Sequence, residues 1–140
     1  MSKPQTILLI EDNALLAMVS SEVLRAHGFS VHVANGGVQA FHVLGVLTPD
    51  IILIDYDMPD MNGAQVVKQV RGRGYTGPVI MWSGQPDLPP DAMMVTVFVC
   101  KGAGPAALLN VINDSIIPFN RETVETQAVL LAGQDSRELL

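Results

Sequence analysis

Five polar side chains that could take part in chemistry stand at the ends of short apolar runs of the chain. Three of them are carboxylates, one is a hydroxyl and one is an ammonium. Carboxylates held a few ångströms apart repel one another, and this repulsion is relieved by protonation or by a bound cation. In chain order, the five residues are Glu11, Asp12, Asp55, Ser83 and Lys101.

A divalent metal ion is the expected relief for the three carboxylates. Mg²⁺, or Mn²⁺ in its place, prefers oxygen ligands, and Mg²⁺ commonly binds through one or two carboxylates together with phosphate oxygens. We therefore expect Asp12 and Asp55 to be direct ligands and the longer Glu11 to act through a water molecule. The backbone carbonyl of Asp57, just beyond Asp55, is the candidate third protein ligand.

The same cluster could accept a phosphoryl group. With a metal bound, one carboxylate oxygen remains available as a nucleophile towards phosphorus, and the charge of the transferred group needs donors around it. Lys101 would supply a positive charge and Ser83 a hydroxyl. Gly84 has no side chain to obstruct a phosphodonor, so the backbone at Gly84 and at Asp57 is expected to line the phosphate site.

The apolar runs predict the strands that would hold these residues. Short uninterrupted runs are typical of strands buried on both faces, and an alternating run is typical of a half-buried strand such as a sheet edge. Helical patterns lie between them, with Gly28 as a stop and Pro105 in a first turn. The predicted strands are residues 7–10, 30–34, 51–54, 79–82 and 95–100, and the predicted helices are residues 13–27, 37–47, 64–73 and 103–117.

Strands that alternate with helices imply right-handed crossovers and one parallel, doubly wound α/β sheet. Ligands bind at the carboxyl ends of the strands in such sheets, which is where the five polar residues stand. The last crossover is irregular. Pro86, Pro89 and Pro90 block an early helix, so only residues 91–94 are left for a shortened fourth helix of about one turn.

The composition excludes several classes of function. Eight Lys and Arg against fourteen Asp and Glu give a net charge of −6, so direct nucleic-acid binding is not expected. The longest uncharged stretch, residues 26–49, contains too many polar residues to span a membrane, and the run at residues 7–10 is too short for a signal peptide. The single cysteine, Cys100, excludes an internal disulfide, and we expect a cytoplasmic protein.

Four motifs follow or include the predicted strands: Glu-Asp-Asn at residues 11–13, Asp-Tyr-Asp-Met-Pro-Asp-Met-Asn-Gly at 55–63, Pro-Val-Ile-Met-Trp-Ser-Gly at 78–84, and Phe-Val-Cys-Lys at 98–101. Together they resemble the receiver domains of two-component response regulators. The resemblance spans residues 5–119 and implies a flavodoxin-like, five-stranded sheet of order 2-1-3-4-5. Residues 120–140 would form a tail, for which an extra helix and a disordered segment are both open.

The resemblance implies a role for each site residue. Asp55 would be the phosphoacceptor, and its phosphorylation would draw Ser83 inward and let Phe98 become buried, as a shift between two packings. The family usually places a proline in a cis peptide after its lysine, whereas Gly102 stands here, so we expect no cis bond. The other implied roles are an acidic pair, Glu11 and Asp12, and a lysine that contacts the phosphate, Lys101.

The expected function is that of a stand-alone receiver. It would take a phosphoryl group from a histidine kinase or a histidine phosphotransfer protein, with Mg²⁺, and hydrolyse it slowly by itself. The residues after Phe119 are too few for an output module, so the output would be contact with an unidentified downstream protein. A homodimer is compatible with the sequence.

Two alternatives stay open. A degenerate receiver would act only as a scaffold, which Gly102 and the irregular crossover favour and the intact Asp12, Asp55 and Lys101 oppose. The order Asp55-Tyr-Asp57 also resembles the D-x-D motif of haloacid-dehalogenase-like phosphatases, although that reading leaves the acidic pair unexplained. A flavin-binding protein is excluded, because the turn after the first strand has acids where a phosphate-cradling loop is needed.

Overall fold

Five parallel strands form one sheet with the order β2-β1-β3-β4-β5. This order confirms the predicted doubly wound α/β fold, and every neighbouring pair runs parallel. The computed structural model describes residues 4–85, 87–92 and 94–116. The strands are β1 (Thr6–Ile10), β2 (Ser30–Ala34), β3 (Ile51–Ile54), β4 (Val79–Ser83) and β5 (Val97–Cys100).

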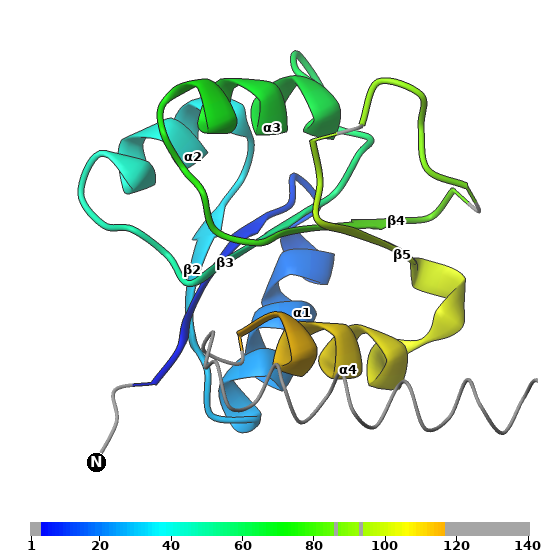
Figure 1. Ribbon diagram of the computed structural model, residues 1–140. Coiled ribbons are helices and arrows are strands. Elements are labelled where there is room, and N and C mark those ends of the chain that lie inside the picture. Colours follow the sequence, from blue (N-terminus) through cyan, green and yellow to red (C-terminus); the bar gives the residue numbers. More distant parts are fainter. Residues whose placement is uncertain (1–3, 86, 93, 117–140) are drawn as a thin grey trace, which may run out of the picture.

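Four α-helices cover the two faces of the sheet. Figure 1 shows α2 and α3 on one face and α1 and α4 on the other. The helices agree with those predicted to within a few residues; the largest difference is at α2, which ends before Gly45. They are α1 (Ala14–Ala26), α2 (Gly37–Leu44), α3 (Gly63–Gly72) and α4 (Pro105–Ile116), with a short 3-10 helix, η1 (Lys101–Ala103), directly after β5.

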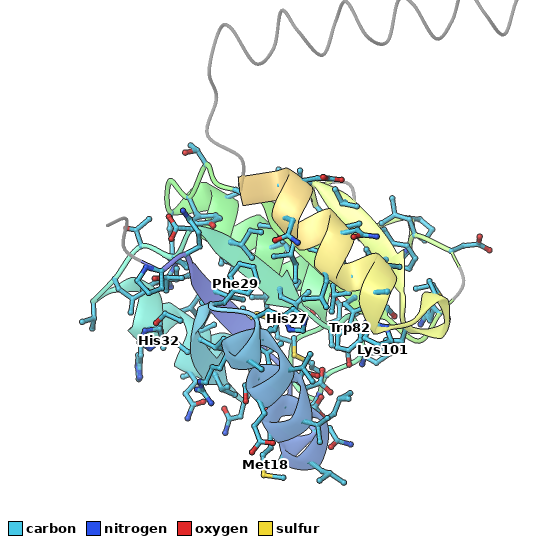
Figure 2. All side chains as sticks on the ribbon, turned by 90° about the horizontal axis from the view of Figure 1, so that it is seen from below. Met18, His27, Phe29, His32, Trp82 and Lys101 are labelled. Carbon is cyan, nitrogen blue, oxygen red and sulfur yellow. The ribbon has the colours of Figure 1, made fainter. Side chains whose placement is uncertain are left out.

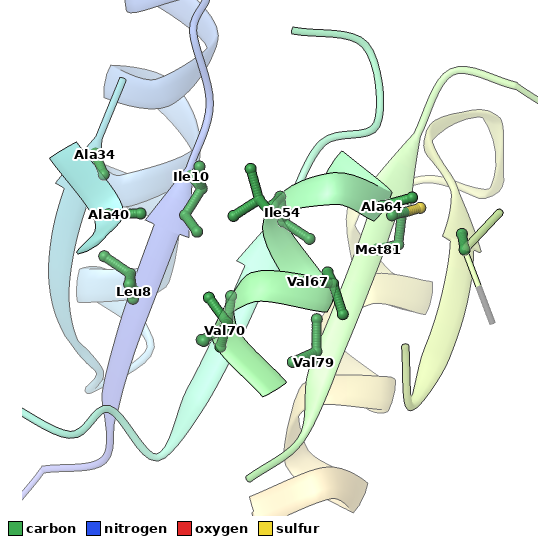
Figure 3. Close-up of a cluster of buried hydrophobic side chains, with 13 residues drawn as sticks. Leu8, Ile10, Ala34, Ala40, Ile54, Ala64, Val67, Val70, Val79 and Met81 are labelled. Carbon is green, nitrogen blue, oxygen red and sulfur yellow. The ribbon is translucent and has the colours of Figure 1, made fainter. Parts of the chain in front are cut away.

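The core consists of two apolar layers, one on each face of the sheet. Successive side chains of a strand point to opposite faces, so a strand buried on both sides needs an unbroken apolar run. Leu8 and Ile10 of β1 belong to the layer under α2 and α3, whereas Ile7 and Leu9 belong to the layer against α1 and α4. Figure 3 shows the first layer, in which Val67 and Val70 of α3 stand over the strands.

The strand register sets the place of the site. Ile10 pairs with Ile54, Ile54 with Met81, and Met81 with Phe98, so these four residues form one row across the sheet. Hydrogen bonding continues past this row, because the amide of Asp55 donates to the carbonyl of Ile10. The residues that follow the row therefore share one edge of the sheet.

The connection between β4 and β5 contains no helix among residues 84, 85, 87–92 and 94–96. A short helical turn was predicted at residues 91–94, but the described residues 91, 92 and 94 are not helical. A turn here is closed by a hydrogen bond from the Ala92 amide to the Pro89 carbonyl, at 3.0 Å. Prolines lack the amide hydrogen that a helix needs, which explains why the crossover is not helical here. β5 begins at Val97, two residues later than predicted.

Three further expectations concern the peptide bond after Lys101, the tail and membrane-spanning helices. No cis peptide occurs among the described residues, in agreement with Gly102 after Lys101. The tail at residues 120–140, with its extra helix as one option, lies outside the described residues. Of the helices in the described part of the chain, none combines the length and the apolar character that a membrane span requires.

Candidate functional site

Three carboxylates meet at the carboxyl edge of the sheet. Glu11, Asp12 and Asp55 each have one side-chain oxygen within 4.8 Å of the others. Glu11 and Asp55 are buried, while Asp12 is exposed. Pairing of β1 with β3 brings these residues together, although more than forty positions separate Asp12 from Asp55. The convergence expected from the ends of the apolar runs is therefore present.

Lys101 lies beside two of the three carboxylates. Its Nζ is 3.4 Å from Asp55 Oδ2 and 3.8 Å from Glu11 Oε2. The same nitrogen stands 5.3 Å from the centre of the Trp82 ring, and Figure 2 shows the two side chains next to each other. One ammonium opposes three carboxylates, so the cluster keeps a net negative formal charge.

The surroundings of Glu11 in this cluster disfavour its charged form. Burial, and next the neighbouring carboxylate of Asp55, raise the pKa of Glu11 from 4.5 to about 7, and Lys101 opposes this rise only in part. A carboxylate whose charged form is disfavoured this strongly needs a proton or a cation nearby. Oxygen donors of this kind suit a hard divalent ion such as Mg²⁺, with Asp12 open to solvent as the entry side.

Asp55 is held at this edge by its own loop. The Tyr56 amide donates to Asp55 Oδ1 at 2.8 Å, which leaves Oδ2 directed to Lys101. The first residue of α3, Gly63, packs directly against the backbone of Asp55: a Cβ built on Gly63 would overlap the Asp55 carbonyl oxygen. Asn62 begins α3 with a capping box, in which its side chain and that of Gln65 each accept from the other's backbone amide, both at 2.9 Å.

Ser83 and Gly84 lie at the end of β4, next to the cluster. Ser83 is fully buried, and its Oγ accepts from the Gln85 amide at 3.2 Å. Among the described residues it makes no hydrogen bond to Asp55 or Lys101. Gly84 is exposed, and a Cβ added there would meet no atom within 4 Å. The structure thus leaves open space beside Gly84.

Phe98 and Asp57 stand at the borders of the site. Phe98 is half-buried and packs against the apolar layer under α2 and α3. Asp57 is exposed, and its carboxylate accepts from Gln85 Nε2 at 3.4 and 3.5 Å. Neither side chain belongs to the carboxylate cluster itself.

Sequence reasoning missed two contacts around this site. Gln85, which touches both Ser83 and Asp57, follows the same strand end as Ser83 and could have been found by extending that argument by two residues. Asp91 accepts from the hydroxyl of Tyr56 at 3.0 Å, and this hydrogen bond raises the pKa of Tyr56 above 10.0. No sequence signal pairs positions that are 35 residues apart.

A family model described as response regulator receiver domain matches residues 7–112. The chain belongs to this family. Receiver domains of two-component systems carry a phosphorylatable aspartate, bind Mg²⁺ at an acidic pocket and interact with histidine kinases. The acidic cluster of Glu11, Asp12 and Asp55 is compatible with such a pocket.

Known proteins similar to this receiver include regulators and sensor kinases. It is 36% identical over 83 residues to the DNA-binding response regulator MtrA of Mycobacterium tuberculosis, which covers 59% of this chain and 36% of MtrA. The chain spans well under half the length of the curated relatives it matches. A solved CheY-like receiver domain from Methylobacillus flagellatus is 29% identical with a TM-score of 0.73, covering 81% of this chain and 99% of that one.

A second solved structure is the receiver domain of the sensor histidine kinase PA1611 from Pseudomonas aeruginosa. It is 26% identical with a TM-score of 0.70, and the match covers 81% of this chain and 98% of that chain. That structure has a magnesium ion coordinated in its active-site cleft.

Proposed function

We propose that this receiver accepts a phosphoryl group on Asp55 from a histidine kinase or a histidine phosphotransfer protein, with Mg²⁺, and signals by contact with a downstream protein. The observation that carries the proposal is the cluster at the sheet edge, in which Lys101 Nζ lies 3.4 Å from Asp55 and the oxygens of Glu11, Asp12 and Asp55 lie within 4.8 Å of one another. These groups are the nucleophile, the cation site and the charge that phosphoryl transfer requires.

The metal site uses the acidic cluster. Asp12 and Asp55 are the direct carboxylate ligands, Glu11 acts through water, and the backbone carbonyl of Asp57 completes the protein's share. The raised pKa of Glu11 supports this assignment, because burial and then the neighbouring Asp55 carboxylate disfavour its charged form, which a bound cation would favour. Bound Mg²⁺ would neutralise carboxylate charge and orient phosphate oxygens.

The acceptor chemistry uses the geometry of Asp55. The hydrogen bond from the Tyr56 amide fixes the carboxylate, so that one oxygen can attack phosphorus in line with the leaving group. The new O–P bond forms as the N–P bond of the phosphohistidine breaks, and the electron pair of that bond stays on the imidazole nitrogen. Lys101 stabilises charge on the transferred group, and the backbone at Gly84 and Asp57 lines its path.

The signal is a change of packing around Ser83 and Phe98. Ser83 Oγ holds the Gln85 amide in the unphosphorylated protein, and Phe98 is half-buried. Phosphorylated Asp55 recruits the Ser83 hydroxyl, and Phe98 moves into the space that is vacated, which favours one of two packings. Ser83→Ala should then keep phosphorylation but lose the phosphorylation-dependent gain in partner affinity.

The direct test of the acceptor is labelling of the full chain with a small acyl phosphate or with phosphorylated histidine kinases. Asp55→Asn should abolish a base-labile label, whereas Asp57→Asn, a neighbouring exposed carboxylate, should keep it. Persistent labelling of Asp55→Asn would contradict the proposal. Absence of label in the native chain would favour the scaffold, and steady turnover of a phosphomonoester would favour the phosphatase alternative.

The metal site is tested by thermal unfolding with and without Mg²⁺. At a hundredfold excess over its dissociation constant, Mg²⁺ should stabilise the protein by about 2.7 kcal/mol. Asp12→Asn should lose most of this gain, and the native protein without a Mg²⁺ effect would refute the site.

The pKa of Glu11 gives the pH dependence of the metal-free protein. The folded protein binds more protons than the unfolded one between pH 4.5 and about 7, so its stability falls as pH rises through this window. Mg²⁺ binding near pH 7 should release a fraction of a proton, which calorimetry in buffers of different ionisation enthalpy measures. Glu11→Gln should remove this release.

A further inference from the structure

An apolar groove runs between α1 and α4, on the face of the sheet away from α2 and α3. It has a volume of about 260 Å³. Leu16, Val19 and Val23 of α1 form one wall, Leu108 and Leu109 of α4 form the other, and Trp82 forms the floor. Ser20 is the one residue with a side-chain hydroxyl among the groove's lining residues. The groove therefore offers few hydrogen-bonding side chains to water.

The outer surface of α1 extends this apolar area. Leu15 is 67% exposed and Met18 51%, and Val19 and Val23 at the groove wall are 48% and 38% exposed. In Figure 2, Met18 points away from the helix to the outside, and Trp82 lies on the side shared by α1 and α4. A contiguous exposed apolar surface of this kind marks a place where another segment or molecule docks.

The chain itself contains an occupant of suitable chemistry. The described chain ends at Ile116 in α4, the same helix that supplies Leu108 and Leu109 to the groove wall. The residues that follow, 117–140, include the uninterrupted apolar run Ala-Val-Leu-Leu-Ala at positions 128–132, and Val124 lies four residues before it. An apolar run of this composition gains free energy when it leaves water.

The distances allow the run to reach the groove. Leu109 lies seven residues before Ile116 on one helix, or about 10 Å at the helical rise of 1.5 Å per residue. The twelve residues from Ile116 to Ala128 span roughly 20 Å even as a random coil. A tether of this length gives an effective concentration of order millimolar, so a weak apolar contact suffices for docking.

We propose that residues 124–132 dock in the groove between α1 and α4 and cover Trp82. The occupant is thus a segment of the same chain, and the inference holds whether or not Asp55 is the phosphoacceptor. Docking over Trp82 places the segment near Lys101, whose Nζ stands 5.3 Å from the Trp82 ring centre. Residues 124–132 of the same chain would then cover the exposed apolar side chains of α1 at the groove.

Trp82 reports on this docking because it is the one tryptophan of the sequence. In the full chain, Leu130→Asp and Leu131→Asp should shift its emission to the red and remove its protection from acrylamide. The matched control, Gln134→Asp, adds the same charge outside the apolar run and should leave both signals unchanged. Val19→Asp on the groove wall should reproduce the effect of the tail variants, and circular dichroism checks that each variant is folded.

A peptide of residues 120–140 completes the test. Added to the full-length Leu131→Asp variant, it should restore the emission and the protection of Trp82, and the same peptide with Leu131→Asp should not. The inference is overturned if Trp82 of the native chain is as accessible as in Leu131→Asp at every protein concentration. It is also overturned if the protection disappears on dilution, because a second copy of the chain would then be the occupant.

Discussion

Two connections leave the same edge of the sheet, and they are held in different ways. The connection from β3 to α3 has a contact between residues close in sequence at each end, the Tyr56 amide on Asp55 and the capping box of Asn62 and Gln65. The connection from β4 to β5 has no helix in its described residues, and distant side chains hold it. Local contacts thus help to fix the β3–α3 connection, whereas the β4–β5 connection depends on contacts with residues distant in sequence.

Two side chains, those of Asp91 and Arg71, make the contacts that hold the β4–β5 connection. Asp91, in the β4–β5 connection, accepts from the Tyr56 hydroxyl at 3.0 Å and from Asn62 Nδ2 at 3.5 Å. Arg71 of α3 donates to the Met94 carbonyl and to Thr96 Oγ1, both at 3.3 Å. Damage to the β3–α3 connection should therefore spread to the β4–β5 connection, but the reverse effect should be weak.

The largest effect is expected from Gly63→Ala. The new Cβ would overlap the Asp55 carbonyl and lie 3.0 Å from Tyr56 Cα, so the loop must move away from α3. We expect a loss of about 3 kcal/mol or more in the free energy of unfolding, measured with urea, because the overlap is with backbone atoms, and weaker contacts at both connections. Gly72→Ala, where a Cβ meets nothing within 4 Å, is the control and should be neutral or stabilising.

Arg71→Ala should come next and should loosen the β4–β5 connection together with the turn between α3 and β4. Its guanidinium also donates to the carbonyls of Tyr75 at 3.1 Å and Gly77 at 2.6 Å, so several charge-assisted hydrogen bonds are lost. The expected cost is about 1.5–3 kcal/mol, with faster hydrogen exchange at residues 94–97 and unchanged exchange at α3. Equal acceleration in both regions would show that the two connections are not held separately.

Asn62→Ala should cost about 1 kcal/mol, the usual price of a lost helix cap. Asn62→Ser separates the two roles of this residue, because serine can cap α3 but has no amide to donate to Asp91. We expect Ser to restore most of the stability while the β4–β5 connection keeps the faster hydrogen exchange of the alanine variant. Full recovery by serine in both regions would mean that the 3.5 Å contact to Asp91 contributes nothing.

Tyr56→Phe should have the smallest effect on the free energy of unfolding, because it removes one exposed hydrogen bond. The Tyr56–Asp91 hydrogen bond can be tested more specifically by titrating the Tyr56 hydroxyl at alkaline pH. The hydrogen bond to Asp91 raises the pKa of Tyr56, so Asp91→Ala should lower it towards 10.0. Burial raises the pKa of Tyr75 to about 12, so a Tyr75→Phe background isolates the signal of Tyr56. An unchanged titration of Tyr56 in Asp91→Ala would contradict the contact.

The same comparison explains what could be predicted from the sequence. The strands, their order by resemblance and the meeting of Glu11, Asp55 and Lys101 were predictable, because the carboxyl ends of parallel strands share an edge. The prolines at positions 86, 89 and 90 predicted that the helix between β4 and β5 would be shortened. The anchors of that crossover were not predictable, since Arg71 and Thr96 are 25 residues apart and no local pattern records such a pair.

The role of Arg71 has a consequence for variation in chain length. One planar guanidinium fastens the end of the crossover at Met94 and Thr96, and Asp91 fastens its middle, while Asp87 and Leu88 are exposed between these points and β4. Insertions between residues 87 and 88 would lengthen a free span, whereas an insertion between 94 and 96 would pull both acceptors out of reach. A foreign epitope or a second folded module could be grafted at the first position with the sheet left intact.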